Sequence, residues 1–296
     1  MTSAAATVRA VSEDKPIGLW SDALRRMRRS PSAIIGATII GFFVLVAIFA
    51  PFLAPFDPIK GNLADSYLPP SPEHWFGTNV QGQDMLSRII FGSRLTLGIA
   101  VLSVAIGVSV GSFFGALAGY FRGWVDAAIM RGVDIMLSIP GLLFAIAVVT
   151  YLGRGVVQIA IAIAIVNIPI FARLLRGSLL SLRDADYVIA ARSVGVRGPT
   201  LLTRHMLPNA IGPLIVQGTL ALATAVVDAA ALGFLGLGPP DPRTPEWGSM
   251  LSDTYRYLSS AIHLAFFPGI AIVLSVLGFN LLGDGMREAL DPKLRR

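Results

Sequence analysis

The amino-acid sequence predicts an all-α polytopic membrane protein with six membrane-spanning helices. Its 296 residues are 54% hydrophobic and only 14% charged, whereas soluble domains carry about 25% charged residues. Six stretches are almost free of Asp, Glu, Lys and Arg, and none is much shorter than the roughly 20 residues that a helix needs to cross a bilayer. None of them alternates between apolar and polar residues as the strands of a membrane barrel do. Helices, which satisfy their backbone polar groups internally, therefore fit best.

The six predicted spans are residues 32–56, 95–121, 135–153, 155–172, 206–240 and 257–283. Pro140 and Pro169 lie in or near the third and fourth spans. We expect them to kink these helices, with a gating hinge as the alternative.

Small residues form a stripe along the second span. Glycine recurs every fourth residue, at Gly107, Gly111, Gly115 and Gly119. Such a stripe lets another helix approach closely. We expect the partner helix to belong to the same chain, and a contact with a second subunit is the alternative.

The distribution of Lys and Arg predicts the orientation. Of these residues, 18 flank the spans on the side that holds both termini, and 6 lie on the other side. Cytoplasmic loops are rich in Lys and Arg, so both termini are placed in the cytoplasm. An even number of spans agrees with both termini lying on one side. The chain then divides into five parts. They are a cytoplasmic N-terminal segment (1–31), a first span (32–56), an external segment (57–94), a core that includes a cytoplasmic loop at 183–208 (95–286), and a cytoplasmic tail (287–296).

Composition also narrows the chemistry. The absence of cysteine excludes disulfides and thiolate metal ligands, and His74, His205 and His263 lie too far apart in sequence for zinc-ligand spacing. No Gly-x-x-x-x-Gly-Lys-Ser/Thr phosphate loop occurs. We therefore expect no catalytic residue, no cofactor and no metal in this chain. The net charge of +6 is interpreted as a topology signal, not as a sign of nucleic-acid binding.

The cytoplasmic loop has the signals of two short helices joined at a glycine. Asp186 favours a helix N-terminus, Arg192 favours a C-terminus, and Gly195 can end a helix. Pro199 suits the start of a second helix, which we expect to stop at Pro208. An ordinary amphipathic connector at the membrane surface is the alternative.

Family resemblance favours a specific role for this loop. Ala190, Ala191, Gly195 and the Leu-Pro pair at 207–208 resemble the signature loop of binding-protein-dependent ABC importer permeases, and Tyr187, Arg192, His205, Pro208 and Asn209 also fit it. Ile189 stands where the family often has Glu. The resemblance implies that the loop, here called the coupling segment (residues 183–208), forms a coupling helix that docks in a cleft on an ATPase subunit.

The resemblance covers almost the whole chain and narrows to the C-type permease subunit of dipeptide and oligopeptide (peptide/nickel-type) importers. It is carried by FGTN at 76–79, ALGFLGLG at 231–238, EWGSML at 246–251 and LGDGMR at 282–287. It implies the type I ABC importer permease fold in a bacterial inner membrane. The implied partners are a second permease subunit, two ATPase subunits that bind ATP and Mg, an extracytoplasmic binding protein, and membrane lipid. Nickel or another small solute remains an alternative substrate.

Three polar residues within the spans are candidate translocation-pathway residues. Asp228 is the one acid well inside an apolar run. A charge there costs on the order of 3 kcal/mol, so it should face protein or water. A structural hydrogen bond that fixes the fifth span is the alternative. Asn167 and Asn280 are the other two, and hydrogen bonding between helices is their alternative role.

Two features outside the spans suggest contacts. Residues 24–29 form a basic amphipathic stretch that is suited to the membrane surface. The external segments carry aromatic residues that mark either a protein interface or the membrane boundary: Tyr67, Trp75, Phe76, Trp247 and Tyr255. A secondary transporter is the competing function, but it would show inverted repeats and paired broken helices, and neither is recognisable in the sequence.

Overall fold

The computed structural model describes residues 24–257 and 260–290. Within these residues the regular secondary structure is helical, except for one isolated β-bridge between Thr78 and Asp84. Parts of two predicted regions lie outside the described residues: most of the cytoplasmic N-terminal segment and most of the tail. The bases that fall there are Arg9, Lys15, Lys293, Arg295 and Arg296.

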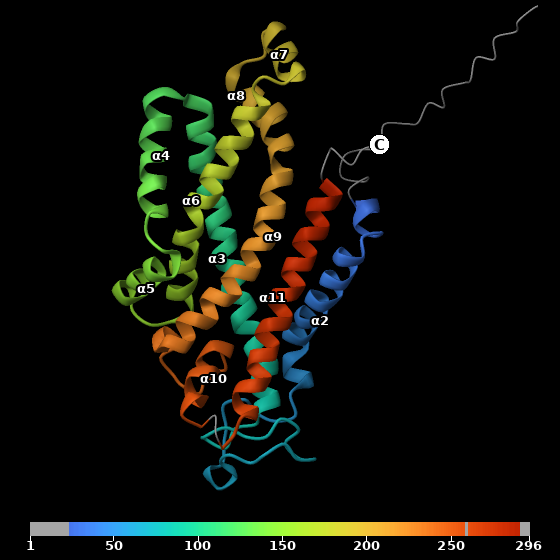
Figure 1. Cartoon of the computed structure of the whole chain (residues 1–296), viewed down its shortest axis with the longest axis vertical. Helices are drawn as coiled ribbons and strands as arrows, with labels where there is room; N and C mark the ends of the chain where they lie inside the picture. The colour runs from blue at the N-terminus through green and yellow to red at the C-terminus, as the bar shows by residue number, and fades with distance from the viewer. Residues whose placement is uncertain (1–23, 258–259, 291–296) are drawn as a thin grey trace, which may run out of the picture.

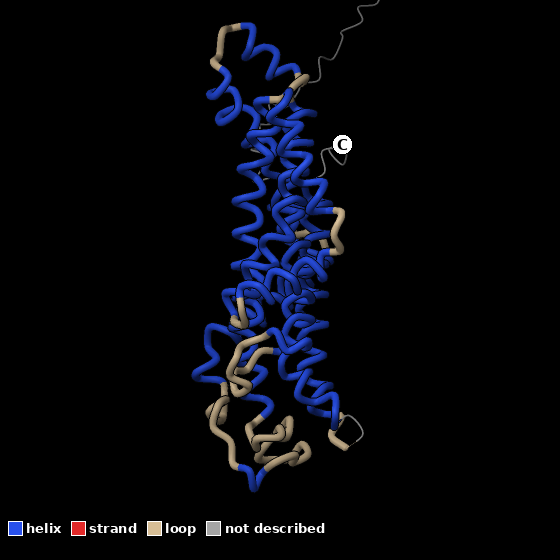
Figure 2. The backbone as a smooth tube through the Cα atoms, turned by 90° about the vertical axis from the view of Figure 1, so that its left-hand side faces the viewer, coloured by secondary structure: helices blue, strands red, loops and turns tan. Residues whose placement is uncertain are grey.

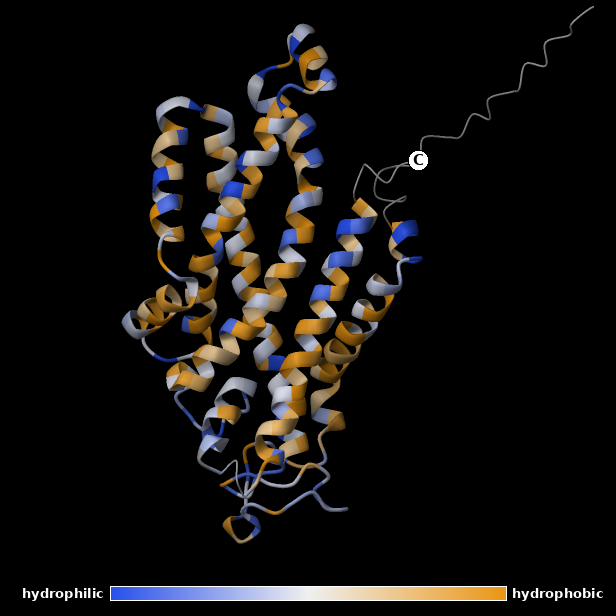
Figure 3. Cartoon of the chain, in the orientation of Figure 1, coloured by the Kyte–Doolittle hydropathy of each residue, from blue (hydrophilic) through white to orange (hydrophobic). Residues whose placement is uncertain are grey.

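Five long helices run side by side along the molecule (Figures 1 and 2). They are α2 (Pro31–Leu53), α3 (Met85–Phe121), α6 (Val156–Leu182), α9 (Leu207–Leu232) and α11 (His263–Leu290). Each is, or belongs to, a helical run that is long and apolar enough to cross a membrane. Figure 3 shows hydrophobic residues along most of their length. Loops gather mainly at one end, beside α10 (Trp247–Thr254), which we call the α10 end.

A bent pair of helices provides a sixth crossing if the pair is counted as one span. The third predicted span is wrong as a single helix, because α4 (Gly123–Leu137) and α5 (Gly141–Leu152) meet at an angle of 92°. Pro140 is the N-cap residue of α5. Proline has no backbone N–H and disfavours helical conformation at the residue before it. Pro140 therefore separates two helices instead of only kinking one. Pro169, by contrast, lies inside α6, which continues through it.

Two helices extend beyond their predicted spans. The helix α3 begins at Met85, where the Asp84 side chain accepts a hydrogen bond from the Ser87 backbone N–H (2.7 Å). The helix α6 continues to Leu182 and carries arginines that bind α4. Arg176 makes two hydrogen bonds to Asp126 (2.5 and 2.7 Å), and Arg173 contacts Asp134 (2.5 Å). These two helices thus include charged residues at positions where the charge has a partner or lies at an exposed helix end.

The glycine stripe of α3 packs against α6, so the expected partner within the same chain is confirmed. A Cβ atom on Gly111 would lie 2.5 Å from the Ile168 carbonyl oxygen, and one on Gly115 would lie 2.5 Å from the Ala172 carbonyl oxygen. Hydrogen in place of a side chain lets the two backbones approach at these points. The α3–α6 interface is the most extensive contact between two helices in the described part of the chain.

Both described chain ends lie at the end opposite α10. The start of α2 and the end of α11 lie side by side there (Figure 1), and the Ser30 hydroxyl donates to the Glu288 carboxylate (3.2 Å). The helix α7 (Asp186–Ser193) lies at this same end, which we call the α7 end. This arrangement agrees with an even number of crossings.

The packing predicts a difference between two glycines of α3. Gly111→Val should destabilise the folded subunit by about 1–3 kcal/mol, because the new side chain meets α6 backbone that cannot move aside. Gly98→Val is the matched control, since nothing lies within 4 Å of a Cβ atom at that exposed position. Thermal unfolding in detergent measures both, and equal melting temperatures for the two variants would contradict the packing argument.

Candidate functional site: coupling segment, cavity and opposite surface

The coupling segment protrudes at the α7 end as two short helices joined by a glycine corner (Figure 1). The helix α7 is followed by α8 (Gly198–Thr200), as the sequence predicts. Gly195 has φ +80°, a left-handed conformation that residues with a Cβ atom rarely adopt. The Gly195 N–H donates to the Arg192 carbonyl oxygen (3.0 Å), and the Val196 N–H donates to that of Ala191 (3.1 Å). These bonds close the end of α7.

One face of α7 is anchored and the others are open. Val188 is fully buried in the core cluster, and Ala191 packs against that cluster. By contrast Tyr187, Ile189 and Val194 are 40%, 49% and 80% exposed. The small residue Ala190 is exposed beside them. An apolar surface therefore projects from the end of the bundle, where another protein can contact it.

Arginines surround this open surface. Arg192, Arg197 and Arg204 are exposed, and within residues 24–257 and 260–290 they form no ion pair. Guanidinium groups without an internal partner remain available for acidic groups on a neighbouring protein or for lipid headgroups.

The second coupling helix does not stop at Pro208, and that prediction is wrong. A helical run extends from Gly198 through Leu232 and ends in a π-helical turn, Gly233–Leu237, that is kinked at Gly236. It includes a π-helical turn over Leu201–Met206, and Pro208 lies in the first turn of α9. Proline removes one backbone hydrogen bond and its ring displaces the preceding turn. The wider π-helical turn accommodates that displacement. The half-buried His205 contributes its carbonyl oxygen to this turn, which accepts a hydrogen bond from the Asn209 side chain (2.7 Å).

A cavity of about 180 Å³ lies between α9 and α11. Its lining residues are Ala223, Thr224, Val227, Asp228, Val276 and Asn280. Two of the three candidate pathway residues, Asp228 and Asn280, thus share one cavity. The third, Asn167, is buried elsewhere: its side-chain amide donates to the Ile163 carbonyl oxygen of its own helix (2.9 Å), and it packs against α3 at Gly107.

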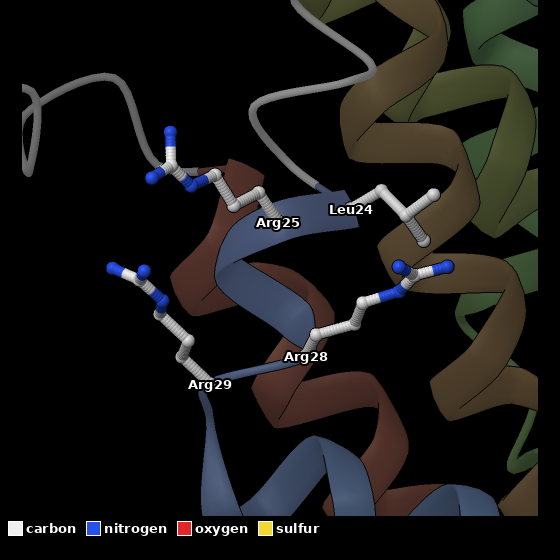
Figure 4. A pocket seen from close by; sticks show the side chains of 4 residues that line it. All are labelled: Leu24, Arg25, Arg28 and Arg29. Atoms are coloured by element: carbon white, nitrogen blue, oxygen red, sulfur yellow. The ribbon is translucent and has the colours of Figure 1, made fainter.

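A basic concavity marks the start of α2. Leu24, Arg25, Arg28 and Arg29 line an open surface hollow of about 400 Å³. Figure 4 shows the three guanidinium groups pointing away from the short helical turn that carries them. The sequence predicts such a basic stretch, and the structure adds that the chain enters α2 directly after it, at Pro31.

The surface at the α10 end is organised by a buried arginine. Arg88 is 1% exposed. Its guanidinium donates to Gln83, to the Pro58 carbonyl oxygen (3.3 Å) and, across the surface, to the carbonyl oxygens of Arg243 (2.9 Å) and Pro242 (3.4 Å). The two segments that the sequence places outside the membrane are therefore joined. Nothing in the residues next to Arg88 in the sequence signals that its side chain is buried.

The aromatic residues of the α10 end do not all lie at the surface. Trp247 is fully buried and its indole N–H donates to the Ile89 carbonyl oxygen (3.1 Å), so its prediction as a surface or membrane-boundary residue is wrong. Phe76 stacks on Phe267 at 3.9 Å between ring centroids. Trp75, which is 69% exposed, remains available for contact, and Tyr255 is 54% exposed.

Glu246 is a buried acid that the sequence analysis did not single out. Its carboxylate accepts hydrogen bonds from the Gly248 N–H (2.9 Å) and from the Ser249 N–H and hydroxyl (2.8 and 2.7 Å). Burial raises the pKa of Glu246, and these donors act in the opposite direction. The residue is therefore a helix cap for α10.

The segment GVSVG at 107–111 matches the Gly-x-Ser-x-Gly pattern of hydrolase nucleophiles, but its setting does not. Ser109 lies within α3, and its hydroxyl donates to the Ala105 carbonyl oxygen (2.7 Å). A nucleophile of this type requires a sharp strand-to-helix turn. The pattern carries no catalytic site here.

Comparison with known proteins agrees with this geometry. Residues 111–296 match the family described as binding-protein-dependent transport system inner membrane component, and residues 18–70 match the N-terminal TM domain of oligopeptide transport permease C. The dipeptide transport system permease protein DppC of Alkalihalophilus pseudofirmus is 45% identical over 276 residues, which cover 93% of this chain and 90% of that protein. The glutathione transport system permease protein GsiD of Escherichia coli is 44% identical over 280 residues, with coverage of 93% and 91%.

Solved structures share the fold. The methionine ABC transporter MetNI in an inward-facing conformation has a TM-score of 0.59 at 20% identity, and the match covers 70% of this chain and 98% of that chain. An amino acid ABC transporter with histidines gives 0.54 at 16% identity, with coverage of 69% and 94%. The fold is thus that of a type I ABC importer permease, a multi-pass inner-membrane protein. The chain belongs to the binding-protein-dependent transport system inner membrane component family.

The Arg88 contacts predict that a positive charge alone cannot hold the two segments of the α10 end together. Arg88→Lys should lower the free energy of unfolding by about 1–3 kcal/mol, because an ammonium cannot reproduce the fork that reaches both segments. It should also make residues 57–84 more sensitive to limited proteolysis. Arg94→Lys on the exposed side of the same helix is the control and should change neither. Wild-type proteolysis in Arg88→Lys would count against the role of Arg88 in joining the segments.

Proposed function

We propose that this chain is the C-type permease subunit of an ATP-driven importer of dipeptides or oligopeptides. The observation that carries the proposal is the 45% identity to a dipeptide permease over 93% of the chain. Its geometry supports the proposal, because the second helix of the coupling segment lies on the same helical run, Gly198–Leu232, as the cavity residue Asp228.

Energy would come from partner subunits. The sequence contains no phosphate loop, so two ATPase subunits would bind ATP and Mg and hydrolyse the nucleotide. The contact surface would be α7, the glycine corner and the exposed arginines, with Tyr187, Ala190, Ala191, Arg192, Gly195, His205 and Pro208 as the coupling residues. A docked helix transmits force only if its contacts differ between two states of the partner. Alternating access of the cavity would follow from that difference.

The excess of Lys and Arg on one side supports a cytoplasmic location for the α7 end and both termini. The basic concavity of Arg25, Arg28 and Arg29 would then face anionic lipid headgroups at the inner surface. The α10 end would meet the extracytoplasmic binding protein. A second, homologous permease subunit would cover the exposed apolar side of the cavity helices, where Val227 and Val273 are 47% and 64% exposed.

Transport of nickel or another small solute by the same class of importer is the second candidate function. Reconstitution with the partner subunits and the binding protein separates the candidates. Mass spectrometry of the ligand that copurifies with the binding protein identifies the solute, and uptake of that solute into proteoliposomes in the presence of ATP tests the function. Uptake that continues without ATP would indicate a secondary transporter instead.

The glycine corner predicts a graded loss of coupling. Gly195→Val should reduce copurification of the ATPase and solute uptake by roughly tenfold, since a β-branched residue resists a left-handed backbone conformation by about 1–2 kcal/mol. Gly195→Asn is the matched control: asparagine tolerates this conformation better and should retain most activity. The site has no steric conflict, because nothing lies within 4 Å of a Cβ atom there. Equal uptake by the valine and asparagine variants would contradict the backbone argument.

The orientation predicts the outcome of cysteine labelling in a chain that has no natural cysteine. A membrane-impermeant thiol reagent should label Lys60→Cys in intact cells, because Lys60 is 87% exposed at the α10 end. Arg25→Cys at the opposite end should be labelled only after permeabilisation. The reverse pattern would invert the topology.

A further inference from the structure

We propose that the cavity between α9 and α11 is a binding site for the ammonium group of the transported solute, with the Asp228 carboxylate as the group that binds it. This inference rests on the proposed function, because it assigns the cavity to the path of the solute. It adds the chemistry that the path recognises: a cationic amine, such as the free amino terminus of a peptide.

The first observation is that Asp228 has no internal partner. Within residues 24–257 and 260–290 it makes no hydrogen bond and no ion pair. No Lys, Arg, His, Asp or Glu other than Asp228 occurs in α9. A carboxylate in an apolar span normally pairs with protein or faces water. The structural role, a hydrogen bond that fixes the fifth span to a neighbouring helix, therefore has no contact within the described part of this chain to support it.

The second observation is the composition of the cavity wall. Thr224 and Asp228 lie one turn apart on α9, and Asn280 lies across from them on α11. The other lining residues, Ala223, Val227 and Val276, are apolar. The Thr224 hydroxyl donates its hydrogen to the Ala221 carbonyl oxygen (3.0 Å), so it can only accept from a ligand. Three side chains therefore present acceptor oxygens to one space.

Three acceptor side chains match the three N–H donors of a primary ammonium group. Such a group carries one positive charge and three N–H donors, and it has no acceptor. The carboxylate of Asp228 can balance the charge, while the oxygens of Thr224 and Asn280 can accept further hydrogen bonds. A cavity of about 180 Å³ exceeds by far the 10–15 Å³ or so that one water needs. It therefore has room for the amine and the adjoining carbon atoms.

A divalent metal ion fits this wall less well. In the described residues, no group of three or more His, Cys, Asp and Glu side chains could hold a metal ion. A hard or borderline cation would find one carboxylate and two neutral oxygens, with no imidazole or thiolate. The lining thus favours an organic amine over a bare nickel ion as the occupant.

The absence of natural cysteine permits a direct test that does not depend on the binding protein. In the full importer complex, Thr224→Cys places one thiol on the cavity wall. Its modification by a cationic methanethiosulfonate, which carries a trimethylammonium group, is compared with modification by the anionic sulfonate reagent. The intact mass of this chain measures each rate, so cysteines in partner subunits do not interfere.

The cationic reagent should react about tenfold faster than the anionic one, relative to their rates with a free thiol, which corresponds to about 1.4 kcal/mol. Adding Asp228→Asn should bring the two rates to within about twofold, whereas Asp228→Glu should preserve the preference. Asp284→Asn, one turn beyond Asn280 on α11, should have a smaller effect. A preference unchanged by Asp228→Asn, an equal loss in Asp284→Asn, or a thiol that neither reagent reaches would each overturn the proposal.

Uptake of labelled alanyl-alanine separates this inference from the proposed function. If the wild-type complex reconstituted with its binding protein transports the dipeptide with ATP, the proposed function holds. Asp228→Asn should then reduce uptake about tenfold without loss of thermal stability, because asparagine keeps the shape and removes the charge. Wild-type uptake by Asp228→Asn would reject the ammonium site while leaving the importer assignment intact.

Discussion

The helix α3 is the element on which the other parts of the structure depend, because its two ends and its middle contact regions that are distant in sequence. At its start, Arg88 binds carbonyl oxygens from both segments of the α10 end. Along its middle, glycines bring it against the α6 backbone. Near its end, the Tyr120 hydroxyl lies 2.5 Å from the position of a Cβ atom on Gly198, where the second coupling helix begins. A tilt of α3 would therefore disturb both surfaces and the bundle between them.

The helical run from Gly198 to Leu232 gives the coupling segment a mechanical connection to the cavity. Backbone hydrogen bonds make a helix stiff along its axis, so a displacement of α8 moves α9 as a body more easily than it compresses it. The π-helical turns over Leu201–Met206 and Gly233–Leu237 interrupt the regular bonding at the two ends of α9. Interruptions of this kind are where helices bend. The segment that holds Asp228 thus lies between two points of bending and can move relative to α11.

The sequence predicts where the apolar spans lie but not their shapes. Apolar runs locate the spans because hydrophobic length is set by the bilayer. The same criterion ends a predicted span at the first charge, so it misses the helical residues around Arg88 and Arg176, whose charges have partners in the fold. Pro140 and Pro208 look alike in sequence. Pro140 lies where two helices meet at an angle of 92°, whereas Pro208 follows a π-helical turn and the helix continues through it. Tertiary contacts decide that difference.

The candidate site shows the same limit. The glycine corner at Gly195 is readable because its signal is local. The meeting of Asp228 with Asn280 is not, since it depends on the register in which α9 packs against α11. The burial of Trp247 is hidden for the same reason: its partner, the Ile89 carbonyl oxygen, is 158 residues away.

Two acids, the buried Glu246 and the partly buried Asp228, show how a structural carboxylate differs from one that is left for a ligand. Glu246 is fully buried, but three donors from α10 face its oxygens. Hydrogen bonds to a charged group contribute about 1.5–3 kcal/mol each, which offsets its desolvation. Asp228 has no such donors among the described residues, and an unpaired charge within a span costs on the order of 3 kcal/mol. Asp228 therefore does not stabilise the fold. Its position beside an open cavity is explained by a positive charge that binds there from outside the chain.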